Sequence, residues 1–227
     1  MITEKPQILC DLAVDIGFLV DSSQYKPEDF AQVKGFVKRI VNGFAVEGNT
    51  PRAGLVSFGS AASFDIPFFQ YASPKTFNAA LDRVAQSGGT RRIDKGIALA
   101  FDELFTKFGA RPNVPQLLFL ITTGRQSKES GYRQPKFVAE YFHEVGNKIM
   151  AVGIGPDVDQ EELIGITKDK NNVHLVQNFK DLAKKTFSKK ITKAACLASG
   201  ETFDCIFMSS SFFVPNLLCY ILEESLR

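Results

Sequence analysis

A carboxylate and two hydroxyl groups follow an apolar stretch near the start of the chain. Residues 12–20, LAVDIGFLV, are mostly apolar and rich in β-branched side chains, and Asp21, Ser22 and Ser23 come directly after them. Such a run is typical of a strand buried on both faces of a parallel sheet. Open α/β sheets bind ligands at the carboxyl ends of their strands, and oxygen atoms of this kind suit a hard cation such as Mg²⁺. We therefore expect a polar site after this strand.

Small polar residues also occupy three later turns. These are SGGT at 87–90, TTGRQS at 122–127 and GIGPD at 153–157. The turns at 87–90 and 122–127 are expected to meet the Asp21 turn above the carboxyl edge of one sheet, because the ends of parallel strands share that edge. The sequence thus predicts a site assembled from segments that lie far apart along the chain.

Strand and helix patterns alternate through most of residues 12–191, which predicts an α/β fold with a doubly wound, mainly parallel sheet. The expected strands are 12–20, 51–58, 63–67, 116–122, 148–154 and 173–176. The strand at 63–67 is short and closed by proline, so it is expected at an edge and paired antiparallel. Two helices are expected to begin at Pro27 and Pro74. Four more are expected at about 93–108, 137–145, 159–166 and 179–191.

Length and composition fit one globular domain with a tail. The chain has 227 residues, of which 44% are hydrophobic and 23% are charged. A formal net charge of +2 gives no reason to expect a nucleic-acid partner. We divide the chain into a lead at 1–10, a domain at 11–193 and a C-terminal tail at 194–227. Residues 205–222 carry no charge but contain three serines, an asparagine and a proline, so we expect packed strands, a loop or an aberrant tail there and no membrane helix.

The four cysteines are Cys10, Cys196, Cys205 and Cys219, and none forms the CxxC pair of a structural zinc site. Cys10 precedes the first strand and Cys196 follows the last predicted helix. Domain termini often lie close together, so a disulfide between these two would clamp the ends of the domain. The alternative is two unpaired thiols in a cytosolic protein. The first ten residues lack the apolar segment of a signal peptide, which fits an intracellular protein, a fragment or a mature form.

Other catalytic patterns are incomplete. Gly153 and Gly155 form half of a dinucleotide-binding fingerprint and lack its third glycine. His143 falls on a predicted helix and His174 within a strand, neither near a serine nucleophile, which argues against a Ser-His-Asp hydrolase. One enzymatic alternative stays open, a small α/β hydrolase or phosphatase that uses Asp21. It predicts phosphate-ester turnover that disappears in Asp21→Asn.

Six segments in order resemble the von Willebrand factor type A domain over about residues 11–193. They are DIGFLVDSS, GLVSFGSAA, SGGTRRIDKGIALA, LLFLITTGRQS, IMAVGIGPDVDQEEL and NVHLVQNFKDL. Each is a weak signal alone, whereas six in this order and spacing are specific. The sequences of these segments are most similar to those of A domains in collagen-like and other extracellular matrix proteins. The resemblance implies a Rossmann-like, six-stranded sheet with one short antiparallel edge strand and helices on both faces. It also implies secretion, and many such domains carry a closing disulfide where Cys10 and Cys196 stand.

The resemblance further implies a metal-ion-dependent adhesion site (MIDAS). Asp21, Ser23 and Thr90 match three of its metal ligands, whereas Tyr25 stands where a second serine belongs and Thr123 where an aspartate belongs. A phenol oxygen lies several ångströms farther from the backbone than a serine oxygen, and threonine removes a full negative charge. We therefore expect a degenerate site that binds Mg²⁺ or Mn²⁺ weakly. The alternative is that Asp21 caps its own loop by accepting hydrogen bonds from local backbone N–H groups.

The resulting prediction is a non-enzymatic module for protein–protein adhesion or matrix assembly. Its expected docking surface is the carboxyl edge of the sheet around Asp21, Ser23, Thr90 and Thr123, and its expected partner is an extracellular matrix protein or another protein. A purely structural domain that associates with itself without metal is the alternative. No membrane partner is expected.

Overall fold

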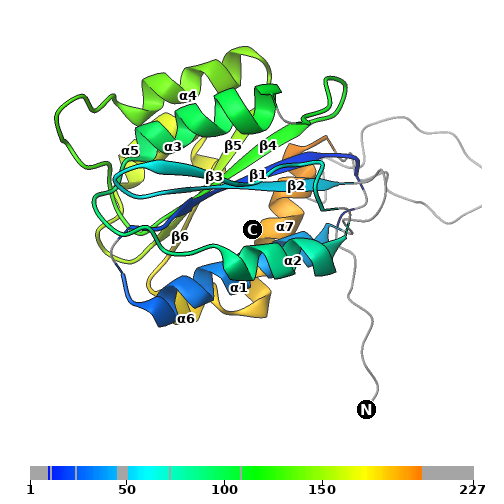
Figure 1. Ribbon diagram of the computed structural model, residues 1–227, viewed down its shortest axis with the longest axis horizontal. Coiled ribbons are helices and arrows are strands. Elements are labelled where there is room, and N and C mark those ends of the chain that lie inside the picture. The colour runs from blue at the N-terminus through cyan, green and yellow to red at the C-terminus, as the bar shows by residue number, and fades with distance from the viewer. Residues whose placement is uncertain are drawn as a thin grey trace, which may run out of the picture.

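The computed structural model describes residues 10, 12–23, 25–44, 51–71, 73–107 and 109–200, which form a six-stranded sheet between two layers of helices (Figure 1). The strands run in the order β3-β2-β1-β4-β5-β6, and neighbours pair in parallel except β2 with β3. This confirms the predicted Rossmann-like sheet with one short antiparallel edge strand. The strands are β1 (Asp15–Asp21), β2 (Arg52–Phe58), β3 (Ala62–Ile66), β4 (Gln116–Thr122), β5 (Lys148–Ile154) and β6 (Val173–Val176).

Helices α1, α2, α6 and α7 cover one face of the sheet, and α3, α4 and α5 cover the other (Figure 1). Proline stands at the first turn of α1, α2 and α4, where its missing N–H costs no hydrogen bond. Ser73 caps α2, because its hydroxyl accepts a hydrogen bond from the Thr76 N–H at 3.3 Å. The helices are α1 (Pro27–Gly43), α2 (Pro74–Arg83), α3 (Ile93–Leu99), α4 (Pro135–Glu144), α5 (Gln160–Thr167), α6 (Phe179–Leu182) and α7 (Lys185–Ala198).

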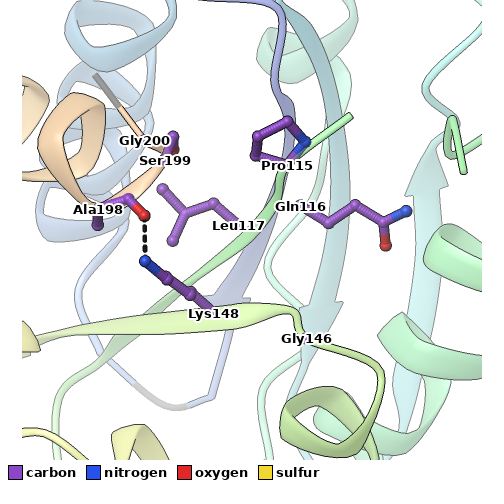
Figure 2. Close-up of a pocket in the computed structure, with 8 residues that line it drawn as sticks. All are labelled: Pro115, Gln116, Leu117, Gly146, Lys148, Ala198, Ser199 and Gly200. Carbon is purple, nitrogen blue, oxygen red and sulfur yellow. Dashed lines mark hydrogen bonds between the residues drawn. The ribbon is translucent and has the colours of Figure 1, made fainter. Parts of the chain in front are cut away.

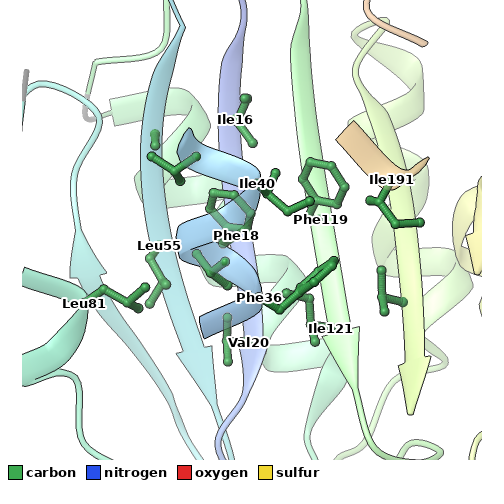
Figure 3. Packing of buried hydrophobic residues seen from close by; sticks show 14 of the residues in the cluster. Ile16, Phe18, Val20, Phe36, Ile40, Leu55, Leu81, Phe119, Ile121 and Ile191 are labelled. Carbon is green, nitrogen blue, oxygen red and sulfur yellow. The ribbon is translucent and has the colours of Figure 1, made fainter. Parts of the chain in front are cut away.

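The central strand β1 is buried along its whole length because helices pack against both of its faces. Phe18 belongs to the cluster under α1, and its neighbour Leu19 belongs to the cluster under α3. Figure 3 shows Phe18 beside Phe119 of β4, with Phe36 and Ile40 of α1 packed over them. The two strand phenylalanines stack with ring centroids 5.5 Å apart. Two covered faces explain why the sequence of this strand is continuously apolar.

The predicted helix at 93–108 changes its geometry halfway. After α3 the chain continues as a π-helical segment, η1 (Ala100–Lys107), which brings Leu104 and Phe105 against glycines of β1 and β2. A Cβ atom on Gly17 would lie 2.6 Å from the Phe105 ring, and one on Gly54 would lie 2.5 Å from Leu104. The close approach of η1 to the sheet therefore depends on two strand positions that have no side chain.

The predicted helix at 179–191 is instead two helices, α6 and α7, separated at Ala183 and Lys184. Arg39 of α1 donates a hydrogen bond to the Leu182 carbonyl at 3.0 Å. That carbonyl would otherwise accept the next bond of a continuous helix. Lys184 takes an extended conformation and starts α7 in a new direction. A single 3-10 turn, η2 (Lys170–Asn172), precedes β6, and the sequence pattern did not predict it.

A disulfide joins Cys10 to Cys196, with 5.7 Å between their Cα atoms. The backbone N–H of Cys10 also donates to the Gly43 carbonyl at the end of α1. Helix α7 continues to Ala198, so the domain boundary expected at residue 193 falls inside this helix. The predictions for residues 1–9 and for the stretch 201–227, including Cys205 and Cys219, concern residues outside the described part of the chain. Among the described helices, none has both the length and the apolar character needed to span a bilayer.

Candidate functional site

The candidate site lies at the carboxyl edge of the sheet, beside the point where the strand order reverses. Strand β1 pairs with β2 on one side and with β4 on the other, so the chain leaves β1 and β4 at neighbouring positions. Ligands of open α/β sheets bind at such a switch point. Asp21 is the last residue of β1, and Thr123 is the first residue after β4. The structure brings these two residues into direct contact.

The Asp21 carboxylate is buried, with 1% of the residue exposed, and both of its oxygens accept hydrogen bonds. Oδ1 accepts from the Ser23 backbone N–H at 2.9 Å, which closes the loop after β1. Oδ2 accepts from the Thr122 hydroxyl at 3.1 Å and from both the backbone N–H and the hydroxyl of Thr123 at 3.0 Å. Asp21 therefore ties its own loop and the loop after β4 together, which is the capping role left open by the sequence.

A guanidinium group also binds this carboxylate. Arg91 Nε lies 2.8 Å from Asp21 Oδ2, and Arg91 Nη2 donates to the Thr123 hydroxyl at 3.0 Å. The Arg91 side chain is 21% exposed. Its backbone is held by Ser127, whose N–H donates to the Arg91 carbonyl and whose hydroxyl accepts from the Arg91 N–H. Sequence reasoning missed Arg91, although two consecutive arginines directly after a glycine-rich turn were a visible signal.

Thr90 points elsewhere. Its hydroxyl lies 3.1 Å from the Ser60 hydroxyl, and its N–H donates to the same oxygen at 2.9 Å. Ser60 belongs to the loop between β2 and β3. The glycine-rich turn packs so tightly on that loop that a Cβ atom on Gly59 would lie 2.2 Å from the Gly88 carbonyl oxygen. The turn is therefore anchored through Thr90 and delivers its next residue, Arg91, to Asp21.

Ser23 and Tyr25 occupy the loop after β1. Ser23 is buried, and its hydroxyl has no hydrogen-bond partner within the part of the chain that is described. The Tyr25 hydroxyl donates to the Asp21 backbone carbonyl, and its ring packs against Phe30 and Phe179. Burial, followed by the nearby Asp21 carboxylate, raises the pKa of the Tyr25 phenol. Tyr25 is thus a neutral donor that braces the loop, and its oxygen is directed to the backbone.

A second buried ion pair, between Arg92 and Asp94, contacts the loop after β4. Arg92 donates to both oxygens of Asp94, from Nε at 2.9 Å and from Nη2 at 2.8 Å. Asp94 also accepts from the Gln126 amide at 2.8 Å and from the Arg133 backbone N–H at 2.9 Å. Burial alone would raise the pKa of Asp94, but the hydrogen bonds from Arg92, Arg133 and Gln126 outweigh it and lower this pKa to about 2. The pair links the glycine-rich turn to the loop at 124–133.

The donor set at Asp21 does not fit a divalent cation in this arrangement. Oδ2 already accepts four hydrogen bonds, one of them from a positively charged group, so a metal ion would have to displace the guanidinium. The unpartnered Ser23 hydroxyl is one member of the expected ligand set that is available. Within the described ranges, no group of three or more His, Cys, Asp or Glu side chains is placed to hold a metal.

The same contacts argue against Asp21 as a nucleophile. Its oxygens are engaged by donors from both loops, and the carboxylate is closed off from solvent. His143 contacts the Ile166 carbonyl on the α4–α5 side of the sheet, and His174 lies in β6. Neither is positioned to act as a base at Asp21 in the arrangement that hydrolases require.

A hollow at the opposite edge of the sheet offers a comparison (Figure 2). It lies at the amino ends of β4 and β5, beside the end of α7. There Lys148 Nζ donates to the Ala198 carbonyl at 2.5 Å and so satisfies an end carbonyl of α7. The Ser199 hydroxyl likewise donates to the Ala195 carbonyl at 2.8 Å, so both of these side chains serve the end of α7. The hollow is lined by Pro115, Gln116, Leu117, Gly146, Lys148, Ala198, Ser199 and Gly200. The carboxyl edge therefore remains the candidate site.

Comparison with known proteins agrees with the fold and with the resemblance seen in the sequence. A family model of the von Willebrand factor type A domain matches residues 15–189. The human collagen alpha-6(VI) chain is 30% identical over 207 residues, which is 88% of this chain and 9% of that one. Chicken matrilin-3 is 27% identical over 200 residues, covering 85% of this chain and 43% of that protein. The chain thus spans less than half the length of these relatives.

Solved structures of a mussel protein share the fold. Proximal thread matrix protein 1 from the mussel byssus superimposes with a TM-score of 0.76 at 26% identity, covering 82% of this chain and 49% of that one. A further structure of the same protein, described as having a zinc-occupied MIDAS motif, gives a TM-score of 0.75 at 26% identity and covers 82% of this chain and 46% of that one.

Proposed function

Because this chain belongs to the von Willebrand factor type A family, we propose that it is a non-enzymatic module for protein–protein interaction or adhesion in a protein of the extracellular matrix. The observation that carries the proposal is the junction at Asp21. One buried carboxylate holds together the loop after β1, the loop after β4 and, through Arg91, the glycine-rich turn. The three loops are already held in place before a partner arrives. Binding therefore costs less conformational entropy than it would if the loops had to be ordered first.

The docking face consists of the exposed parts of these loops around Asp21, Ser23, Thr90 and Thr123. Asp21 and Ser23 are buried and act as its frame, whereas Lys26 and Arg125 are exposed along its rim. A shallow hollow beside the frame is lined by Tyr25, Lys26, Gln86, Ser87 and Gly88. An open hollow with polar side chains of this kind suits the solvent-accessible rim of a protein interface.

The metal site of this chain is degenerate. The zinc-occupied MIDAS belongs to the mussel protein, and here Tyr25 and Thr123 stand at two of the five positions that the resemblance assigns to ligands. The Asp21 carboxylate is already paired with Arg91, so we expect any affinity for Mg²⁺ or Mn²⁺ to be weaker than millimolar. Partner binding therefore rests on the protein surface itself.

The proposed location is extracellular. The collagen VI and matrilin relatives support secretion, and the Cys10–Cys196 disulfide is the kind of bond that persists in oxidising compartments. The proposed partner is another matrix protein.

Binding to matrix proteins tests the proposal. The full chain is immobilised and probed with purified collagens and with a soluble extract of extracellular matrix. Wild type should bind at least one of them, and the double charge reversal Lys26→Glu/Arg125→Glu on the docking face should weaken that binding by about tenfold or more. The matched control is Lys185→Glu/Lys193→Glu, the same charge change on the exposed side of α7. Equal weakening by both pairs, or no binding by wild type, would count against the proposal.

Self-association is a second candidate, favoured by an apolar stripe on the outer side of α4. Phe137 and Tyr141 are each 53% exposed and Val145 is 61% exposed, at a spacing that places them on one side of the helix. A second copy of the chain that paired through this stripe would bury it. Light scattering against concentration should then show a dimer that Phe137→Glu abolishes. A monomer at every concentration would exclude this candidate.

A further inference from the structure

We propose that Arg91 is the resident cation of this site. Its guanidinium takes the place at Asp21 where a divalent metal ion is expected, so the site excludes metal by its own construction. The exclusion of metal stands on the geometry of the site. The consequence that partner binding needs no metal rests on the proposed function.

The guanidinium makes specific contacts with both groups that define the site. Arg91 Nε is 2.8 Å from Asp21 Oδ2, and Arg91 Nη2 is 3.0 Å from the Thr123 hydroxyl oxygen. The Thr123 hydroxyl in turn donates to Asp21 Oδ2 at 3.0 Å. These three groups form a closed ring of hydrogen bonds, in which the positive charge meets the buried carboxylate directly.

Two neighbouring residues leave room for this guanidinium and hold its backbone. A Cβ atom on Gly124 would lie 2.6 Å from Arg91 Nη1, so the absence of a side chain there provides the space. Ser127 pairs with both backbone groups of Arg91. Thr123, Gly124 and Ser127 all lie in the loop after β4, and each of them fits the position that Arg91 adopts. The arrangement is therefore a built site and not one side chain resting on a surface.

Charge explains why Arg91 and a metal ion exclude each other. Among the described residues, Asp21 is the carboxylate that pairs with Arg91 at the junction, and Arg91 already neutralises it. A divalent cation would meet a fixed positive charge within a few ångströms, and in a partly buried site water screens that repulsion poorly. Thr123 contributes no negative charge that could offset it. If Thr123 alone were replaced by aspartate, Arg91 Nη2, which now donates to the Thr123 hydroxyl, would pair with the new carboxylate.

Removing the guanidinium should uncover the oxygens beneath it. Asp21 Oδ2 would lose its charged partner, and the Ser23 hydroxyl, buried and without a partner among the described residues, would be a second ligand. A third, anionic ligand is supplied by Thr123→Asp. Both changes are therefore needed to convert this site into one that binds metal.

Calorimetric titration of the full chain with MgCl₂, MnCl₂ and ZnCl₂ tests the proposal without any partner. Four proteins are compared: wild type, Arg91→Gln, Thr123→Asp and the double variant. Wild type and Thr123→Asp should show no binding at millimolar metal, and the double variant should bind Mn²⁺ about a hundredfold more tightly than either single variant. Arg125→Gln/Thr123→Asp is the matched control, because it removes an equal charge from the same edge.

Thermal unfolding in EDTA and in excess Mn²⁺ gives a second readout that shows whether each variant is folded. The midpoint of wild type should be the same in both, and that of the double variant should rise with Mn²⁺. Arg91→Lys/Thr123→Asp keeps the positive charge and should still exclude metal. Tight binding by wild type, full binding by Thr123→Asp alone, or no gain in the folded double variant would each overturn the proposal. A failure of matrix binding with these metal results intact would instead count against the proposed function.

Discussion

Replacing Asp94 with asparagine should cost far more stability than neutralising an exposed carboxylate of this domain. Asp94 is 1% exposed, and its partner Arg92 is 4% exposed. Each Asp94 oxygen accepts from two donors: Oδ1 from Arg92 Nε and Gln126 Nε2, and Oδ2 from Arg92 Nη2 and the Arg133 N–H. An asparagine amide in either orientation would therefore turn its own NH₂ group toward two donors. It would also leave the buried guanidinium without a counter-charge.

Breaking one side of a buried ion pair costs about 3–5 kcal/mol, and the four hydrogen bonds of Asp94 place Asp94→Asn in that range. Urea unfolding at pH 7, followed by circular dichroism, measures the loss. The control is Asp82→Asn, which neutralises an exposed carboxylate paired with Lys38 at 2.6 Å and should cost about 0–1 kcal/mol. Equal losses for the two variants would refute the reasoning, because they would mean that water reaches Arg92 as freely as it reaches Lys38.

The pH dependence of stability offers an independent check on Asp94. Its pKa in the folded protein is about 2, below the ordinary value of 3.8, so the unfolded chain binds this proton more readily. The stability that Asp94 contributes is therefore present above about pH 4 and is lost as the pH falls from there toward 2. Asp94→Asn should flatten the stability profile in that window. An unchanged slope would show that other carboxylates account for the acid limb.

Three further outcomes follow from the structure. The double variant Cys10→Ser/Cys196→Ser should lose up to about 5 kcal/mol of unfolding free energy, because the disulfide closes a loop with a sequence separation of 186 residues. The denaturant midpoint of wild type with and without reductant measures the same loss, and equal midpoints would contradict it. Tyr25→Phe should cost about 1 kcal/mol for one hydrogen bond, whereas Tyr25→Ser should cost about 3 kcal/mol because the ring packs against Phe30 and Phe179; the difference in urea midpoint reports the packing, and equal costs would refute it. Burial, and then the charge of Lys190, lower the pKa of His174 below 6.5, so the unfolded chain binds this proton more readily than the folded protein. Stability should therefore fall as the pH drops below about 6.5. His174→Gln should lessen the loss of stability between pH 7.5 and 5.5, and a stability profile like that of wild type would contradict the assignment.

The sheet was predictable from sequence because its central strands are covered on both faces. An unbroken apolar run such as Leu117–Ile121 has few other stable positions, and the turn residues around it mark its ends. The break between α6 and α7 was not predictable in this way. It depends on Arg39, which is far away in sequence and captures the Leu182 carbonyl. The π-helical segment depends likewise on two distant glycines.

The same distinction applies to the site. Proximity of the Asp21 and Thr123 loops follows from strand order alone, since short side chains stay near the strand ends that carry them. Arg91 has a long side chain that reaches many positions from one backbone location, so its contact with Asp21 depends on Gly124 and Ser127. Thr90 illustrates the converse. Its place in the motif predicts a metal ligand, and in the structure its hydroxyl lies 3.1 Å from the Ser60 hydroxyl, a contact that the motif does not indicate.

The bond between Cys10 and Cys196 also decides how this domain would carry a mechanical load. The Cα atoms of the two cysteines lie 5.7 Å apart, so the polypeptide enters and leaves the folded unit at nearly one point. A tensile force applied to the flanking chain would pass through a covalent link, and the strands between the two cysteines would not be sheared. In a fibre under strain, such a domain would stay intact until its sulfur–sulfur bond was reduced, and it would keep its loops presented while the chain around it stretched.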